Sequence, residues 1–205
     1  MTLQTDPSWL PNRRGKLTAS RMKDAVAYLK SGKESEDRRK YKIELVAERM
    51  SDYAVDHIVT KPMQRGLDFE APARSEYEEH TGNVVSAAAL VDHPTIELFA
   101  ATPDGFIRHD GLLEIKVPSV HKFIEWRIAG VVPDEHIPQM LAQLSCTDRT
   151  WTDFVGFCPE MPEGSRLFIR RFAPAFEEIE RIEVEALKFL AEVDALFDLV
   201  TQAAA

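Results

Sequence analysis

The sequence predicts an α/β domain over residues 1–205, in which helices flank a mixed β-sheet and one long helix ends the chain. Three observations predict this class. A β-hairpin signal, Asp110-Gly111, lies between two short apolar runs. Apolar residues recur at helical spacing before the hairpin, over 62–81, and after it, over 174–200. The chain has 205 residues, of which 44% are hydrophobic, and this is enough to bury one substantial core.

The N-terminal part is expected to contain a tail and two helices. Residues 1–12 are expected to form a flexible tail. Thr18 or Ser20 can cap a helix over 20–30, because a hydroxyl accepts a hydrogen bond from the first turn. A second helix is expected over 38–50. Its expected apolar face consists of Ile43, Val46, Ala47 and Met50.

Strands and helices then alternate, which suits a sheet covered by helices. The expected strands are 83–91, 95–101, 106–108, 112–117, 151–158 and 166–172. The expected helices are 62–81, 119–129, 133–147 and 174–200. From residue 174 onward the chain carries eight acidic and two basic residues, so the outer face of the amphipathic last helix is acidic.

The hairpin around Asp110-Gly111 brings charged side chains together. In its second strand the apolar side chains point to one face, while Glu114 and Lys116 point to the other. Asp104 precedes the first strand and can lie beside Lys116. Two carboxylates can hold hard divalent cations, and an ammonium group can orient a water or neutralise developing charge. These groups could hydrolyse a phosphodiester, although an ordinary half-exposed hairpin shows the same alternation.

The order of residues around this hairpin resembles the core motif of the PD-(D/E)xK nucleases. Pro103-Asp104 is followed, after nine residues, by Glu114-Ile115-Lys116. Three flanking segments resemble the phage lambda exonuclease family of alkaline, recombination-type exonucleases within that superfamily. They are R-x-G-x-x-T-A-S at 13–20, G-x-x-x-E at 66–70, and a glutamine, Gln139, eight residues before Thr147.

This resemblance implies a restriction-endonuclease-like core and a two-metal active site. The implied catalytic residues are Asp104, Glu114, Lys116, Gln139 and Glu70. The metal ligands would be Asp104, Glu114, the backbone carbonyl of Ile115 and, in a second position, Glu70. Two Mg²⁺ ions per site are expected, with Mn²⁺ able to substitute. Gln143 lies one helical turn after Gln139 and stays open as the alternative for its role.

The same resemblance assigns the N-terminal basic segment to the DNA end. Arg13 would bind the 5′-phosphate and Ser20 would help, with Arg14 as the alternative to Arg13. Residues 12–49 carry twelve Lys/Arg and six Asp/Glu, net +6, whereas the whole chain has a net charge of −9. A basic segment on an acidic protein can line one groove. The basic start of the second helix, Arg38-Arg39-Lys40, is expected to contact the DNA backbone.

The function implied by the family is a Mg²⁺-dependent exonuclease acting on double-stranded DNA ends, preferably 5′-phosphorylated. It would degrade the 5′-ended strand to mononucleotides and leave a 3′ overhang for a single-strand annealing protein. Family members form a homotrimer around DNA, and a phage or prophage origin in a bacterial host is expected. Two alternatives stay open. One is another PD-(D/E)xK nuclease, such as a restriction endonuclease or a RecB-like enzyme; the other is a non-catalytic DNA-end-binding protein.

Composition argues against several other classes of protein. No apolar run is long enough to span a membrane, and the N-terminus lacks a secretory signal, so a cytoplasmic protein without a membrane partner is expected. Cys146 and Cys158 lack the number and spacing of a disulfide framework or a zinc site, and an iron–sulfur cluster would need four cysteines. Oxygen ligands without Cys or His also disfavour zinc.

Overall fold

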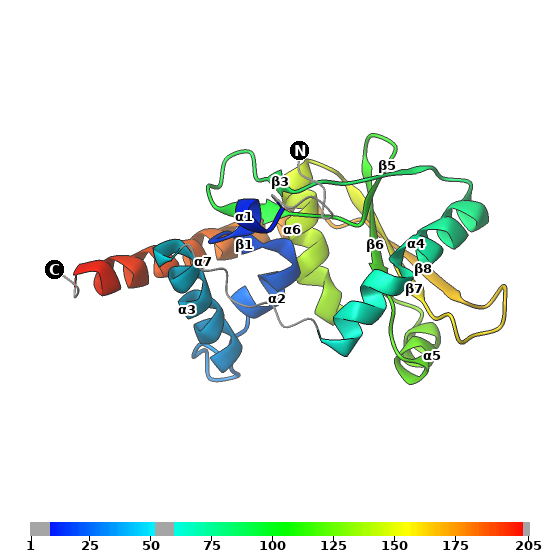
Figure 1. The fold of residues 1–205 in the computed structure, drawn as a ribbon, viewed down its shortest axis with the longest axis horizontal. Helices are drawn as coiled ribbons and strands as arrows, with labels where there is room; N and C mark the ends of the chain where they lie inside the picture. Colours follow the sequence, from blue (N-terminus) through cyan, green and yellow to red (C-terminus); the bar gives the residue numbers. More distant parts are fainter. Residues whose placement is uncertain (1–8, 52–59, 203–205) are drawn as a thin grey trace.

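The computed structural model describes residues 9–51 and 60–202 and confirms the α/β class (Figure 1). The helices are α1 (Trp9–Arg13), η1 (Ala19–Arg21), α2 (Met22–Ala25), α3 (Glu36–Met50), α4 (Lys61–Thr81), α5 (Val120–Ala129), η2 (Asp134–His136), α6 (Ile137–Thr147) and α7 (Phe176–Gln202). The strands are β1 (Leu17–Thr18), β2 (Val85–Ser86), β3 (Val91–Asp92), β4 (Phe99–Ala101), β5 (Gly105–Ile107), β6 (Gly111–Lys116), β7 (Trp151–Phe157) and β8 (Leu167–Phe172).

The strands form two sheets, whereas the sequence predicted one. The larger sheet has the order β2-β5-β6-β7-β8, and only β6 and β7 pair in parallel. The smaller sheet has the order β1-β4-β3, with β1 parallel to β4. The predicted hairpin is confirmed, because β5 and β6 pair antiparallel with Phe106 opposite Leu112. The strands expected over 83–91 and 95–101 are much shorter than predicted.

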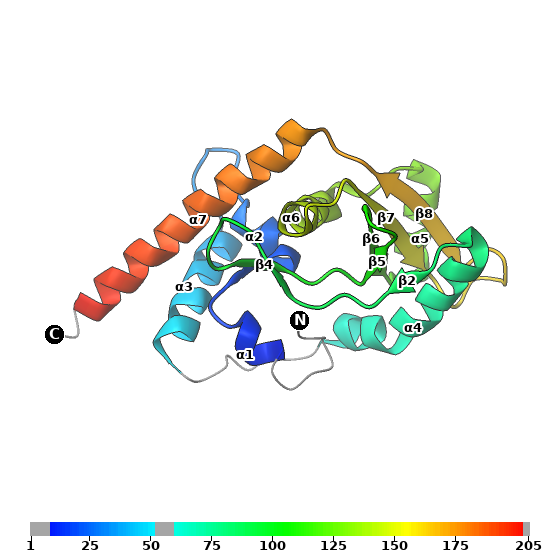
Figure 2. The ribbon, with the colours of Figure 1, turned by 90° about the horizontal axis from the view of Figure 1, so that it is seen from above.

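Different helices cover the two faces of the larger sheet (Figure 2). On one face, Ala73 and Tyr77 of α4 pack against the apolar side chains of β6, such as Leu113. On the other face, Trp126 of α5 and Met140 of α6 pack around Phe154 of β7. A separate core joins α2, α3, α6 and α7. In the described parts of the chain, no helix is both long and apolar enough to cross a membrane.

The N-terminal elements differ from the prediction. The expected tail is described from residue 9 onward, and there it forms α1. The helix expected over 20–30 is replaced by η1 and α2, which ends at Ala25. Thr18 forms no capping hydrogen bond with its side chain, because it lies in β1 and its hydroxyl accepts a hydrogen bond from Arg13.

The buried face of α3 was also predicted wrongly. Ile43 and Met50 are 50% and 47% exposed, whereas Arg38 is fully buried and Lys42 nearly so. Arg38 donates two hydrogen bonds, of 2.6 and 3.0 Å, to the carboxylate of Glu192 on α7, and Lys42 donates a third of 2.8 Å. Arg38 therefore joins α3 to α7 and is too buried for the expected contact with DNA, whereas the contact expected of the exposed Arg39 and Lys40 stays a prediction.

Replacing Glu192 with alanine is expected to lower the free energy of unfolding by about 1 to 3 kcal/mol, because the fully buried Arg38 loses its ionic partner, while water can reach the vacated position since the Glu192 side chain is 42% exposed. The matched control is Asp194→Ala on the same helix. This variant removes the ion pair between Asp194 and Arg49. The Asp194 side chain is 63% exposed, so the expected loss of unfolding free energy is below about 1 kcal/mol. Urea unfolding midpoints at unchanged m measure both losses, and equally small losses would contradict this role of Glu192.

Candidate active site

The turn before β5 places Asp104 beside the end of β6. The backbone N–H of Asp104 donates to the carbonyl of Leu113 at 3.1 Å, and its carboxylate accepts from the N–H of Ile115 at 2.6 Å. The N–H and C=O of one strand residue point to the same side. The Ile115 carbonyl therefore faces the same edge of β6 as the Asp104 carboxylate.

Glu114 is 1% exposed, and three side chains hold its carboxylate. Gln139 donates to Oε1 at 2.7 Å and Gln143 donates to Oε2 at 2.6 Å. The Lys116 ammonium lies 2.5 Å from Oε1 and also donates to the amide oxygen of Gln139 at 3.1 Å. Both candidate glutamines of α6 thus reach the site, but only Gln139 joins Glu114 to Lys116.

The charges of the site shift the pKa values of two groups. Burial and then the negative charge of Glu114 hold the pKa of Asp104 well above its usual range, although Lys116 opposes them. Burial lowers the pKa of Lys116, but the charges of Glu114 and Asp104 outweigh it, so the net pKa is raised. Lys116 is therefore a charged ammonium at neutral pH and a hydrogen-bond donor rather than a base.

Glu70 lies on α4 close enough to Asp104 for its charge to raise the pKa of that carboxyl further. In this structure its carboxylate is paired with Arg74 at 2.7 Å, and the same guanidinium nitrogen donates to the backbone carbonyl of Asp104 at 2.7 Å. The sequence-based prediction missed Arg74. Its position four residues after Glu70 on a helix was the available signal, since such residues are neighbours on a helical surface.

The oxygen atoms at this site fit a hard divalent cation. Asp104, Glu114 and the Ile115 carbonyl lie around the end of β6, and a cation there would offset the repulsion that raises the pKa of Asp104. The side-chain oxygen of Gln143 is buried without a hydrogen-bond partner in the described structure. No three acidic, His or Cys side chains of residues 9–51 and 60–202 form a ready metal cluster. Water would therefore complete the coordination, as is usual for Mg²⁺.

The predicted residues of the N-terminal segment also come together. The Arg13 guanidinium donates to the hydroxyls of Ser20 and Thr18 at 3.0 and 3.1 Å. Burial lowers the pKa of Arg13, but an arginine remains charged. The backbone N–H of Arg14 donates to the carbonyl of Pro11. This cluster thus presents a positive charge flanked by two hydroxyls, which suits an anion.

Helix α6 contacts the elements that carry both this cluster and the acidic site. Its apolar residues Leu141 and Ala142 pack in one core with Leu17 and Ala19, which are neighbours of Thr18. Gln139 and Gln143 of the same helix contact Glu114. One helix therefore sets the position of the two clusters relative to each other.

Comparisons with known proteins show which family and which folds this chain is similar to. Residues 8–150 match the family model described as a YqaJ-like viral recombinase domain. An alkaline exonuclease, LHK-Exo from Laribacter hongkongensis, has a TM-score of 0.87 and 36% identity, over 96% of this chain and 97% of that chain. The same enzyme in complex with dAMP has a TM-score of 0.88, with the same identity and coverage.

A phage related exonuclease from Haemophilus somnus 129PT has a TM-score of 0.71 over 96% of this chain and 99% of that chain. Its identity of 13% supports the fold alone. The comparison with curated protein sequences finds no match.

The fold and the site define a nuclease of the lambda-exonuclease-like class, which confirms the resemblance found in the sequence. Because the family model covers well over half of its length, the chain belongs to the YqaJ-like viral recombinase family.

Proposed function

We propose that this nuclease is a Mg²⁺-dependent exonuclease that degrades the 5′-ended strand of duplex DNA to mononucleotides. The observation that carries the proposal is the buried Glu114 carboxylate, held by Lys116 and Gln139 beside Asp104. The solved complex of LHK-Exo with dAMP supports a mononucleotide product, because dAMP is a nucleoside monophosphate.

Asp104, Glu114 and the Ile115 carbonyl would hold Mg²⁺, with Glu70 at a second position and Mn²⁺ as a substitute. The chemistry such ions would supply is a lower pKa of a bound water and electrostatic stabilisation of the leaving oxygen. Glu70 would have to exchange its present partner, Arg74, for the cation. The buried Glu114 keeps its orientation because both of its oxygens accept hydrogen bonds from α6.

Lys116 acts in this proposal as a fixed positive charge. Its ammonium is oriented by Glu114 and by the amide oxygen of Gln139, and its side chain is 29% exposed. It can therefore donate a hydrogen bond to the attacking water or to a phosphate oxygen, where negative charge develops. Gln139 fixes Lys116 and Glu114 relative to each other.

The proposal also includes partners and a setting. The 3′ overhang left by resection would be used by a single-strand annealing protein in phage-type recombination, in the cytoplasm of a bacterial host. A homotrimer would surround the DNA. The cluster of Arg13 with the hydroxyls of Thr18 and Ser20 supports a DNA partner, because it presents a positive charge and hydrogen-bonding groups that suit a phosphate.

The deciding experiment is the digestion of linear and circular plasmid with and without Mg²⁺. Progressive loss from the ends of the linear form alone supports an exonuclease. Discrete fragments indicate an endonuclease, and binding without cleavage indicates an end-binding protein. Labelling either the 5′ or the 3′ end then gives the direction, because a 5′ label is released early only by attack from that end.

Arg13→Ala is expected to slow digestion of 5′-phosphorylated ends by roughly ten- to a hundredfold, the cost of about 1.5 to 3 kcal/mol for losing one charge-assisted hydrogen-bond partner. The physical reason is that the guanidinium, held by Thr18 and Ser20, would pair with the terminal phosphate. Ends with a 5′-hydroxyl should be digested at nearly the wild-type rate, so the preference for phosphate collapses.

Arg14→Ala is the control for this assignment. If the family motif were aligned one residue later on this sequence, Arg14 would bind the phosphate and the two variants would exchange their phenotypes. Initial rates on matched duplexes with 5′-phosphate and 5′-hydroxyl ends measure the preference. If neither variant narrows the gap between the two substrates, the N-terminal segment is a general contact with the DNA backbone and end recognition by Arg13 is wrong.

A further inference from the structure

Strand β8 is an edge of the larger sheet. It pairs with β7 on one side, and no strand of the described residues pairs with it on the other. In an antiparallel ladder the residues alternate between pointing their backbone groups at the partner and away from it. The N–H of Cys158 donates to the carbonyl of Arg166, so Arg166 directs its backbone groups at β7. The next residue, Leu167, and then Ile169 direct theirs away from β7. Their N–H groups face outward along the open edge.

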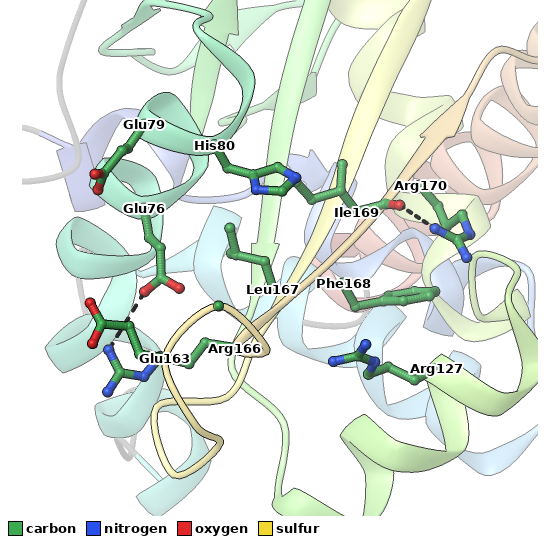
Figure 3. Close-up of a pocket in the computed structure, with 11 residues that line it drawn as sticks. Glu76, Glu79, His80, Arg127, Glu163, Arg166, Leu167, Phe168, Ile169 and Arg170 are labelled. Carbon is green, nitrogen blue, oxygen red and sulfur yellow. Dashed lines mark hydrogen bonds and ion pairs between the residues drawn. The ribbon is translucent and has the colours of Figure 1, made fainter.

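A groove of about 730 Å³ follows this edge. Figure 3 shows its two walls on either side of β8. The wall from α4 carries the exposed Glu79 and also Glu76, whose carboxylate already pairs with Arg166 at 3.9 Å, so Glu79 is its available acid. The other wall is basic, with Arg127 of α5 and Arg170. The groove is separate from the catalytic cluster, since none of its lining residues contacts the Glu114 carboxylate.

A charged side chain occupies part of this open edge. Arg170 donates to the outward carbonyl of Ile169 at 2.7 Å and to the carbonyl of Gly130 at 2.5 Å. Charged side chains on an edge strand suppress pairing with arbitrary strands. A strand that takes over the Ile169 carbonyl must displace Arg170, and an acidic side chain on that strand offers the displaced guanidinium a new partner. Arg170 therefore favours an added strand that carries acidic side chains on the face of the sheet where Arg170 lies.

We propose that the open edge of β8 binds an extended segment of a partner protein as an added strand. Successive side chains of such a strand point to opposite faces of the sheet. One set meets the α4 wall at Glu79, and the other meets the basic wall at Arg127 and Arg170. The segment that fits best therefore alternates basic and acidic residues.

The probe for this site is a synthetic peptide of about eight residues, a typical strand length, in which lysine and glutamate alternate. The control peptide has the same composition ordered in pairs, two lysines followed by two glutamates, which gives both faces mixed charge. Fluorescence anisotropy of labelled peptides against the full chain compares their affinities. The alternating peptide should bind on the order of tenfold tighter, from several matched charge pairs.

Amide hydrogen exchange locates the bound peptide. The alternating peptide should slow exchange at the Leu167 and Ile169 amides, which face outward, and leave Phe168 little changed because its amide already pairs with β7. Glu79→Lys and Arg127→Glu should each weaken binding several-fold. Glu125→Lys is the control, since it makes the same charge change as Glu79→Lys at an exposed position outside the groove.

Each other outcome overturns the proposal. No binding, or equal binding of the two peptides, would show that the groove does not select a strand with alternating basic and acidic residues. Binding without protection of the Leu167 and Ile169 amides would place the peptide elsewhere. Protection of these amides that rises with protein concentration in the absence of peptide would identify a second copy of the chain as the occupant. DNA cleavage by the groove variants should stay at the wild-type rate, so this test is independent of the proposed function.

Discussion

Lys116→Ala is expected to reduce DNA cleavage by about a hundredfold to a thousandfold or more, the loss found when one donor to developing negative charge is removed. The fold should persist, because Glu114 keeps its hydrogen bonds from Gln139 and Gln143 and the lysine is partly exposed. Binding to duplex DNA should also persist, since the contact proposed for the terminal phosphate is made by Arg13 and not by Lys116. Single-turnover cleavage and anisotropy with labelled duplex measure the two properties separately.

Lys122→Ala is the matched control for this variant. Lys122 lies on α5 and pairs with Glu135 at 2.5 Å, and it has no contact with Glu114. If Lys116 acts on the reacting groups, only its own variant loses turnover. Similar losses in both variants would instead indicate a general electrostatic effect, and undiminished turnover in Lys116→Ala would remove Lys116 from the mechanism.

Glu114→Gln is expected to weaken Mg²⁺ binding by at least roughly ten- to a hundredfold, the cost of losing even an outer partner of a metal ligand. Cleavage should fall with it. The substitution keeps the size of the side chain, and the unpaired oxygen of Gln143 can accept a hydrogen bond from the new amide after a flip. The protein should therefore stay folded, and calorimetric titration with Mg²⁺ measures the affinity directly.

A second readout of Glu114→Gln does not depend on metal. The charge of Glu114 is, after burial, the main cause that raises the pKa of Asp104. Removing that charge should move the pKa of Asp104 back toward its usual range, which NMR titration without Mg²⁺ can follow. Asp110→Asn is the control, since it removes a carboxylate from the same hairpin at its far end.

Unchanged Mg²⁺ affinity in Glu114→Gln would show that the Glu114 carboxylate does not hold the metal.

The sequence predicted the hairpin and most helices because their signals are local. Asp110-Gly111 and the flanking apolar runs lie within one short stretch, and Gly82 ends α4 in the left-handed conformation, with φ of 70°, that glycine adopts readily. The second sheet depends on the parallel pairing of Leu17 with Phe99, far apart in the chain. A pattern read along the sequence carries no information on such a pairing.

The buried face of α3 illustrates a different limit. A pattern of hydrophobic residues treats every arginine and lysine as exposed, but Arg38 and Lys42 are buried because Glu192 comes to them from α7. Arg74 shows both cases, since its pairing with Glu70 follows from local spacing, whereas its hydrogen bond to the distant backbone of Asp104 does not. Charged residues are placed by their partners, and a partner distant in the chain cannot be recognised from local spacing.

The packing of α6 against both clusters has a consequence for the size of the product. If Arg13 holds the terminal phosphate, the distance from that phosphate to Glu114 is set by the packing of α6 against Leu17 and Ala19 and by the contact of Gln143 with Glu114. Tightly packed interiors change little in dimension. The distance between the bound DNA end and the cleaved phosphodiester would then be constant. The fragment released would therefore have the same number of nucleotides whatever the DNA sequence.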